Sequence, residues 1–234
     1  VRAVGGSPDL ATMRSLLVAS ARNANMPQAC MAFDDIVREG LAPDLRTYSA
    51  MIRGYCATGC LEKALSYFDA MHAAGVLPDV STFDAMLDAC ASRSMVELTE
   101  RVLVDMEAAG VPPSNMTLAI LVRLHGSIGD LDRALALFEE LPLRHGLEVS
   151  SHAHGALVAA CLAAGRRDLA LEAFARMAAA GCRASARTFE SLIASCVSHG
   201  DLDQAVRLVD DALVLVPEGA DGEAPERPAA APTG

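Results

Sequence analysis

The sequence repeats itself every 35 residues, and this period restricts the fold more than any other feature of the chain. Segments 45–79 and 80–114 place apolar residues, small residues and glycines at the same positions. A unit of this length cannot bury its own apolar surface, so several units must stack on one another into an elongated array. Six units follow the plan: 10–44, 45–79, 80–114, 115–150 (one residue longer), 151–185 and 186–216, the last of them degenerate.

Each unit is expected to form two helices. In segment 45–79, apolar residues recur twice at three- and four-residue spacing, and Gly59 lies between the two runs, where a tight turn is needed. The first run contains Tyr48, Met51, Ile52 and Tyr55, and the second contains Leu61, Ala64, Leu65, Phe68 and Met71. The pattern predicts an all-α fold, a right-handed α-solenoid superhelix of paired antiparallel helices in about six helix-turn-helix repeats. We expect the first helices on the concave side and the second helices on the convex side.

Three segments depart from the regular plan. The extra residue of unit 115–150 falls between Leu141 and Gly146, where we expect Pro142 to end the second helix early. Residues 1–9 include Gly-Gly-Ser-Pro-Asp and look like the end of a preceding repeat. Residues 217–234 are acidic and rich in Pro, Ala and Gly, a composition that predicts disorder.

Composition narrows the classes of function. Aromatic residues make up only 4% of the chain, and β-branched runs are scarce, as expected of an all-helical protein. No window holds 18 consecutive apolar residues, so we predict neither a transmembrane helix nor a membrane partner. The formal net charge is −11, which excludes a wholly basic nucleic-acid binder.

The cysteines and acidic pairs are expected to be structural. Seven cysteines is an odd number, which favours reduced thiols, and Cys90, Cys161 and Cys196 occupy one repeated position typical of a buried core. Asp130 and Asp132 follow a turn glycine, where carboxylates stabilise the start of a helix. The sequence lacks the ligand spacing of a zinc site and any nuclease or deaminase motif. We therefore predict no enzyme: no catalytic residues, no metal and no cofactor.

The repeat resembles that of the pentatricopeptide repeat (PPR) family over about residues 5–216. The resemblance rests on the 35-residue period, the Gly54–Cys56 segment, the Gly75–Asp79 ending, and a Thr-aromatic start. That start is found at Thr47-Tyr48, Thr82-Phe83 and Thr188-Phe189. The resemblance implies single-stranded RNA binding in a mitochondrion or plastid, in organellar RNA processing, stability or translation.

The family resemblance also implies which residues would contact the bases. In PPR proteins the fifth and the last residue of each repeat read one base together. The corresponding pairs here are Arg14 with Asp44, Ser49 with Asp79, Asp84 with Ser114, Ala119 with Ser150, Gly155 with Ser185, and Glu190 with Ala220. Only Ser49 and Asp79 form a typical reading pair, which in the family selects purines, guanine foremost. Arg14 would more naturally meet a phosphate, and Ala119 and Gly155 have no hydrogen-bonding side chain.

Charge is distributed unevenly between the two helices of a unit. The first fourteen residues of the six units hold seven Arg and three acids, a net charge of +4, so the remainder of the chain carries −15. A weakly basic inner groove suits an RNA backbone, and the candidate phosphate contacts are Arg22, Arg46, Arg53 and Arg123. We expect weak RNA binding by this segment alone. The alternative is a non-catalytic protein-interaction scaffold, such as a subunit of an organellar complex, with a protein partner in the concave groove.

Overall fold

The computed structural model describes residues 10–215, and within this range the chain forms twelve α-helices and no strand. The helices are α1 (Leu10–Arg22), α2 (Met26–Arg38), α3 (Leu45–Ala57), α4 (Leu61–Ala73), α5 (Val80–Ala91), α6 (Val96–Ala108), α7 (Asn115–Ser127), α8 (Leu131–His145), α9 (Ser151–Ala163), α10 (Arg167–Ala179), α11 (Ala186–Ser198) and α12 (Leu202–Leu215). The predicted all-α solenoid is confirmed. Over the described residues, no helix has the length and apolar character that crossing a membrane requires. The predictions for residues 1–9 and 217–234 lie outside the described residues.

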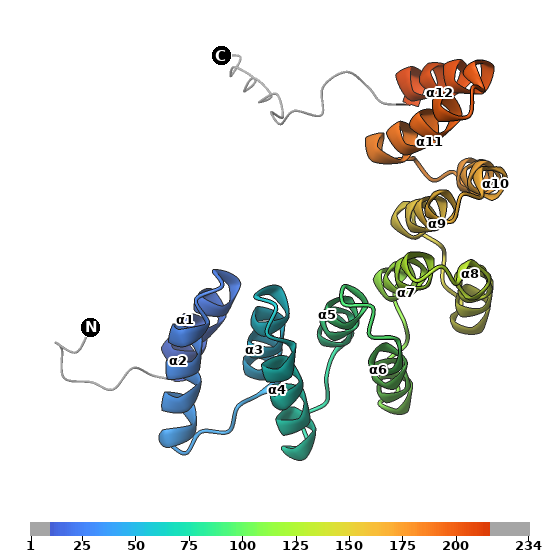
Figure 1. The fold of residues 1–234 in the computed structure, drawn as a ribbon. Coiled ribbons are helices and arrows are strands. Elements are labelled where there is room, and N and C mark those ends of the chain that lie inside the picture. The colour runs from blue at the N-terminus through green and yellow to red at the C-terminus, as the bar shows by residue number, and fades with distance from the viewer. Residues whose placement is uncertain (1–9, 216–234) are drawn as a thin grey trace, which may run out of the picture.

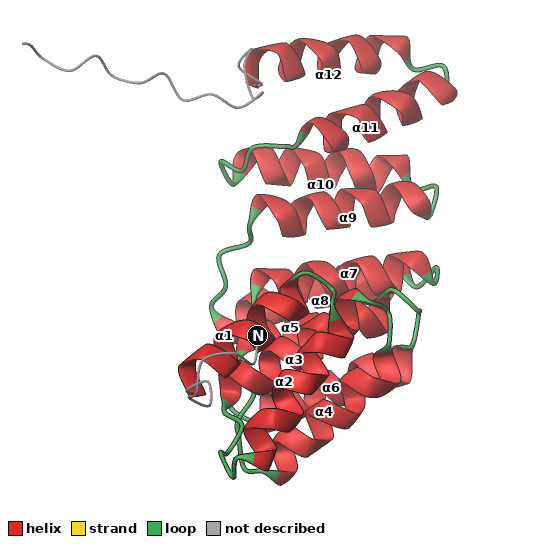
Figure 2. Ribbon diagram, turned by 90° about the vertical axis from the view of Figure 1, so that its left-hand side faces the viewer, coloured by secondary structure: helices red, strands yellow, loops and turns green. Residues whose placement is uncertain are grey.

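The helix pairs are arranged in a curved row (Figure 1). The odd-numbered helices, which are the first helices of the units, line the inner side of the curve, and the even-numbered helices lie outside. Each first helix packs against the first helix of the next unit, whereas second helices of neighbouring units make few contacts or none with each other. Figure 2, seen from the side, shows the last two helix pairs stacked above the others. The concave face is therefore built from first helices, as expected.

The last residue of each unit caps the first helix of the next unit. Asp44, Asp79, Ser114, Ser150 and Ser185 precede α3, α5, α7, α9 and α11, and each side chain accepts a hydrogen bond from a backbone N–H in the first helical turn. Such caps satisfy N–H groups that have no partner inside the helix. Capping therefore fixes each last residue at the junction between two units.

The turn inside each unit depends on backbone conformations that glycine adopts easily. Gly59 follows α3 with a φ of 79°, and Gly165 follows α9 with a φ of 71°. Residues with a side chain rarely take such left-handed values. Both first helices therefore end at these glycines, as the sequence predicts.

The core consists of the two apolar stripes of each unit. Met51, Ile52, Phe68 and Met71 are at most 3% exposed, and Leu65 is half-buried. Cys90, Cys161 and Cys196 are fully buried, as predicted from their repeated position, and their thiols are free. Ring pairs recur between neighbouring units, with centroids 5.2–5.7 Å apart. The four pairs are Phe33–Tyr48, Phe68–Phe83, Phe138–His154 and Phe174–Phe189.

The prediction that Pro142 ends its helix early is wrong. α8 continues past Pro142 to His145 and is 15 residues long, while most of the other helices have 13. Pro142 lies in the last turn, and its carbonyl accepts the N–H groups of Gly146 and Leu147. Gly146, with a φ of 64°, ends the helix instead. The extra residue of this unit thus lengthens the helix.

Candidate nucleic-acid interface

Two hollows on the concave face are lined mainly by first helices. The N-terminal hollow lies between α1 and α3 and has a volume of about 480 Å³. Its charged residues are Arg22, Arg46 and Arg53, and small residues including Ala50 and Gly54 form the rest of its wall. No acidic residue lines it.

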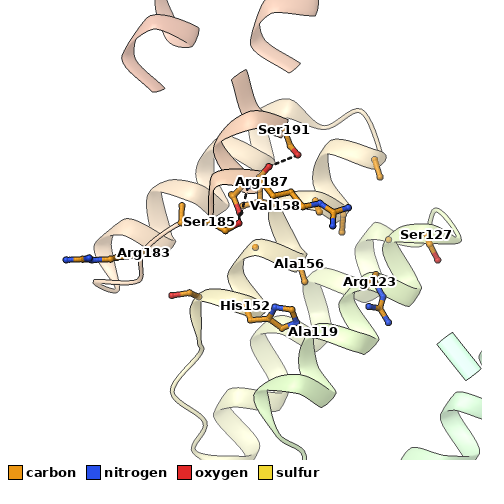
Figure 3. Close-up of a pocket in the computed structure, with 18 residues that line it drawn as sticks. Ala119, Arg123, Ser127, His152, Ala156, Val158, Arg183, Ser185, Arg187 and Ser191 are labelled. Carbon is orange, nitrogen blue, oxygen red and sulfur yellow. Dashed lines mark hydrogen bonds between the residues drawn. The ribbon is translucent and has the colours of Figure 1, made fainter. Parts of the chain in front are cut away.

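The C-terminal hollow is larger, about 660 Å³, and lies across α7, α9 and the start of α11. Arg123, Arg183 and Arg187 surround it together with His152 (Figure 3). Alanines and glycines line most of the remainder, and no acidic residue is among the lining residues. In a protein of net charge −11, both hollows therefore offer only positive charge.

The arginines that line the two hollows differ in whether their guanidinium groups already have a partner within the protein. Arg22, Arg46, Arg183 and Arg187 are exposed, and their guanidinium groups have no ion-pair partner among residues 10–215. Arg53 donates to the hydroxyl of Ser81 over 2.9 Å, which leaves its charge uncompensated. These five side chains are thus available to an anion.

Arg123 is the exception among the predicted phosphate contacts. Its guanidinium forms an ion pair with the carboxylate of Asp88 on the neighbouring helix α5. Both side chains remain about half exposed, at 54% and 53%. A phosphate at this position would have to compete with Asp88.

Ser49 and Asp79 are joined through Thr82. Asp79 Oδ1 accepts hydrogen bonds from the backbone N–H of Thr82 over 2.9 Å and from its hydroxyl over 2.6 Å. The Thr82 hydroxyl has one proton, so Ser49, whose Oγ is 2.7 Å from Thr82 Oγ1, must donate the hydrogen bond between them. Ser49 is only 2% exposed, whereas Asp79 is exposed. Of this pair, only Asp79 can be reached by a ligand in this structure.

In the other two polar pairs the two side chains contact each other directly. Arg14 lies 3.2 Å from the Asp44 carboxylate, to which Thr47 donates both its N–H and its hydroxyl. Burial raises the pKa of Asp44, but the Thr47 hydrogen bonds and the Arg14 charge outweigh it, so this pKa lies below its ordinary value. Arg14 is therefore held by Asp44 and is not placed as a free phosphate contact.

Asp84 and Ser114 form a closed cluster with Thr117. Ser114 donates its hydroxyl to Asp84 Oδ2 over 2.9 Å, and Thr117 donates to Asp84 Oδ1. Ser114 also caps α7 through the backbone N–H groups of Met116 and Thr117. The Asp84 carboxylate thus links α5 to the start of α7.

The C-terminal pairs lack the side chain at the fifth position. Ala119 is buried beside the hollow, and Ser150 caps α9. Gly155 leaves the Thr188 hydroxyl without a partner from α9, and that hydroxyl contacts Ser185 Oγ instead, at 2.9 Å. A Cβ added to Gly155 would lie 3.5 Å from Thr188 Oγ1. The partner predicted for Glu190, Ala220, lies outside the described residues.

Sequence reasoning did not single out Arg183 or Arg187 as ligand contacts. Arg187 is the second residue of its unit, the position that Arg46 occupies four units earlier in the N-terminal hollow, so repeat phase could have identified it. Arg183 lies in the turn between α10 and α11, where the repeat pattern does not indicate which way a side chain points. The fold, not the sequence, brings these two side chains into the lining of the hollow that also includes Arg123.

The site offers positive charge and hydrogen-bonding groups. No group of three or more metal-ligating side chains occurs among residues 10–215. Burial raises the pKa of the Cys56 thiol to about 12 and that of Cys90 to about 11, so both stay protonated near neutral pH. This arrangement suits binding to a polyanion.

Three family models match the chain. A model described as the PPR repeat family matches residues 8–57 and 47–92, and one described as a pentatricopeptide repeat domain matches residues 137–199. A model described as a PPR repeat matches residues 81–111 and 187–213. Together they cover well over half of the sequence. No sequence among the curated proteins matches this chain.

Several solved structures share the fold. The pentatricopeptide repeat protein PPR10 from maize is 26% identical, with a TM-score of 0.67 over 88% of this chain and 29% of PPR10. PPR10 in complex with an 18-nt psaJ RNA element gives 24% identity, a TM-score of 0.62 and coverage of 94% of this chain. The PPR domain of Arabidopsis thaliana protein-only RNase P 1, in complex with tRNA, is 15% identical and has a TM-score of 0.65. The match covers 79% of this chain and 97% of that domain. The chain spans only 30% of the length of PPR10.

Proposed function

Because the chain belongs to the pentatricopeptide repeat family, we propose that it binds single-stranded RNA along its concave face. The observation that carries the proposal is the charge of the two hollows, which are lined by six arginines and no acid in an otherwise acidic protein. A groove of one sign attracts the opposite charge even where the net charge of the protein repels it. PPR10 and the PPR domain of protein-only RNase P 1 have been crystallised with RNA, which supports the same ligand class here.

In this proposal the arginines contact phosphates and Asp79 contacts one base. Arg22, Arg46 and Arg53 would hold the backbone in the N-terminal hollow, and Arg183 and Arg187 in the C-terminal hollow. Contacts to phosphate position a strand without reading its sequence. Asp79, oriented by Thr82 and Ser49, supplies the single base contact, which the family pattern associates with a purine.

Binding should be weak. Five free arginines fall short of the roughly six to ten phosphate contacts of a strong electrostatic binder. The role we propose is recognition of RNA in organellar processing, stability or translation, with any chemistry on the RNA supplied elsewhere. A mitochondrial or plastid location is part of the same proposal.

A protein-interaction scaffold is the second candidate. It is favoured by the bonding of three predicted reading pairs, whose side chains already form ion pairs or hydrogen bonds within the protein. Few polar groups therefore remain free to recognise bases. The alanine and glycine walls of the C-terminal hollow would also admit a partner helix. An RNA titration separates the two candidates.

The test is a fluorescence-anisotropy titration of mixed-sequence single-stranded RNA at several salt concentrations. Replacing Arg22, Arg46 and Arg53 together with Ala should weaken binding to all sequences alike and reduce the salt slope by about three. The matched control replaces Arg101, Arg133 and Arg207, which are exposed on second helices, and should leave the affinity almost unchanged. If the folded wild type does not bind at low salt, RNA is not the ligand and the scaffold becomes the better account.

A further inference from the structure

Helix α5 differs from the other first helices, each of which contributes residues to one of the two hollows. The ninth residues of three successive units are Arg53, Asp88 and Arg123. The charge at this repeat position therefore changes from positive to negative at α5 and back to positive at α7. Asp84 lies one turn before Asp88 on the same helix. Neither hollow includes a residue of α5.

No positive charge on α5 compensates these two carboxylates. Arg93, which follows the helix in the chain, donates to the backbone carbonyls of Ala89 and Gly59 and pairs with neither carboxylate. Asp84 is held in place by Ser114 and Thr117, so it cannot turn away from the junction of α5 with α7. Asp88 is 53% exposed and pairs with Arg123, which reduces the positive charge that the C-terminal hollow presents. A phosphate group crossing α5 therefore meets the Asp84 carboxylate, which has no cationic partner, and an Asp88 that already engages Arg123, and it finds no free cation on this helix.

We propose that α5 interrupts the RNA-binding face, so that one strand is held at two separate sites and crosses α5 without a phosphate contact. The two sites are the α1–α3 hollow and the α7–α9–α11 hollow, and the inference rests on the proposed function. First helices in contact are about 8–10 Å apart, so α3 and α7 are separated by about 16–20 Å. A short oligonucleotide can occupy one hollow only, whereas a longer one can bridge them.

This arrangement has a distinct binding signature. When an RNA becomes long enough to reach the second hollow, the second contact is intramolecular and the affinity rises in one step, by about a hundredfold. A continuous groove would instead add a similar increment with each nucleotide. Removal of the Asp88 charge should free Arg123 and extend the C-terminal site toward α5.

The experiment measures the affinity of oligouridines from about four to about twelve nucleotides for three proteins. These are the wild type, Asp88→Asn, and the matched control Asp69→Asn, which removes an exposed carboxylate from the second helix α4. We expect a step in the wild type, and a gain of about tenfold for short oligonucleotides with Asp88→Asn at about 50 mM salt, the effect of one added phosphate contact. The control should match the wild type.

Two results would overturn the inference while leaving RNA binding intact. One is a smooth rise of affinity with length in the wild type. The other is an equal effect of Asp88→Asn and Asp69→Asn, which would show that only net charge matters. If the wild type binds no oligonucleotide at low salt, the proposed function fails as well, and both proposals are withdrawn.

Discussion

The first three units and the two units that follow them share one scaffold but differ at the fifth residue. In both regions the last residue of a unit caps the next first helix with an Asp or Ser side chain. The fifth residues are Arg14, Ser49 and Asp84 in the first region, and Ala119 and Gly155 in the second. Where the side chain is polar it bonds to the cap or to the neighbouring Thr, whereas Ala119 and Gly155 make no such bond and line the C-terminal hollow. Architecture and recognition therefore depend on different positions of the same repeat.

The cores of the two regions also differ in the side chains that fill them. The N-terminal region contains a connected group of rings, in which Phe33 packs against Tyr48 and Tyr67, and Tyr55 stacks on Tyr67. The C-terminal region is built more from leucines and alanines. There α7 and α9 form the most extensive contact between two first helices, and a Cβ on Gly126 would lie 2.5 Å from the Ala160 Cβ.

The largest effect is expected from Phe68→Ala. Phe68 is 3% exposed and packs against the Phe83 ring with a centroid distance of 5.6 Å. Its truncation should lower the free energy of unfolding by about 3–5 kcal/mol, and the loss should spread to adjacent units because coupling is between neighbours. Phe174 holds the same repeat position but is half-buried, so Phe174→Ala should cost less. Urea denaturation measures both, and equal stability of Phe68→Ala and wild type would contradict the assigned core.

A pair of glycine substitutions compares the packing of the two regions. In Gly126→Ala the new methyl meets Ala160, including its Cα at 3.0 Å, so backbone must move, at a cost of about 1–3 kcal/mol. In Gly54→Ala the nearest atom is the flexible Met26 sulfur at 2.6 Å, which can rotate away. We expect Gly54→Ala to lie within about 1 kcal/mol of the wild type, since alanine also favours the helix by a similar amount. Thermal unfolding that ranks the two in the opposite order would refute the close approach of α7 and α9.

His154 stands at a ring position that Tyr48, Phe83 and Phe189 occupy in other units. Its side chain is buried against Phe138, its Nδ1 has no hydrogen-bond partner, and burial and the Arg176 charge lower its pKa. His154→Phe should raise the free energy of unfolding by about 1–2 kcal/mol at neutral pH because no polar atom is left unpaired.

The same variant should change the pH dependence of stability. A lowered His pKa means that the unfolded state takes up the proton first, so stability falls as the pH drops below the unfolded value of 6.5. This part of the decline should be missing in His154→Phe. Identical pH profiles of variant and wild type, measured by urea denaturation, would show that folding does not lower the pKa of His154.

The smallest expected effect is the base preference of a variant in which a reading pair is introduced into the second region. Gly155→Ser combined with Ser185→Asp would place a serine beside Thr188 and a carboxylate at the cap of α11, as Ser49, Thr82 and Asp79 are arranged. We expect a second purine preference of about 1 kcal/mol, measured by titration with RNAs that differ at one base. The double variant Gly155→Ala with Ser185→Ala is the control and should create no preference.

The repeat period, the helix pairs and the buried positions could be predicted from sequence because each depends on local pattern repeated six times. The course of α8 could not, because a proline in a last turn is tolerated when a following glycine supplies the helix end. The repeat pattern placed Ser49 and Arg123 on the correct helices. It could not predict the burial of Ser49 or the pairing of Arg123 with Asp88, because both depend on residues from a neighbouring unit. The repeat pattern predicts the structure within a unit, but it does not predict the side-chain contacts between units.

The most direct measurement of the difference between the two regions is selection of bound sequences from a random single-stranded RNA pool by the folded wild-type protein. The account predicts one position enriched in purine, facing unit 45–79, and no preference at the positions that face units 115–150 and 151–185. Binding should also fall steeply with salt. Preferences of similar strength along the whole RNA, or no retained RNA at low salt, would contradict it.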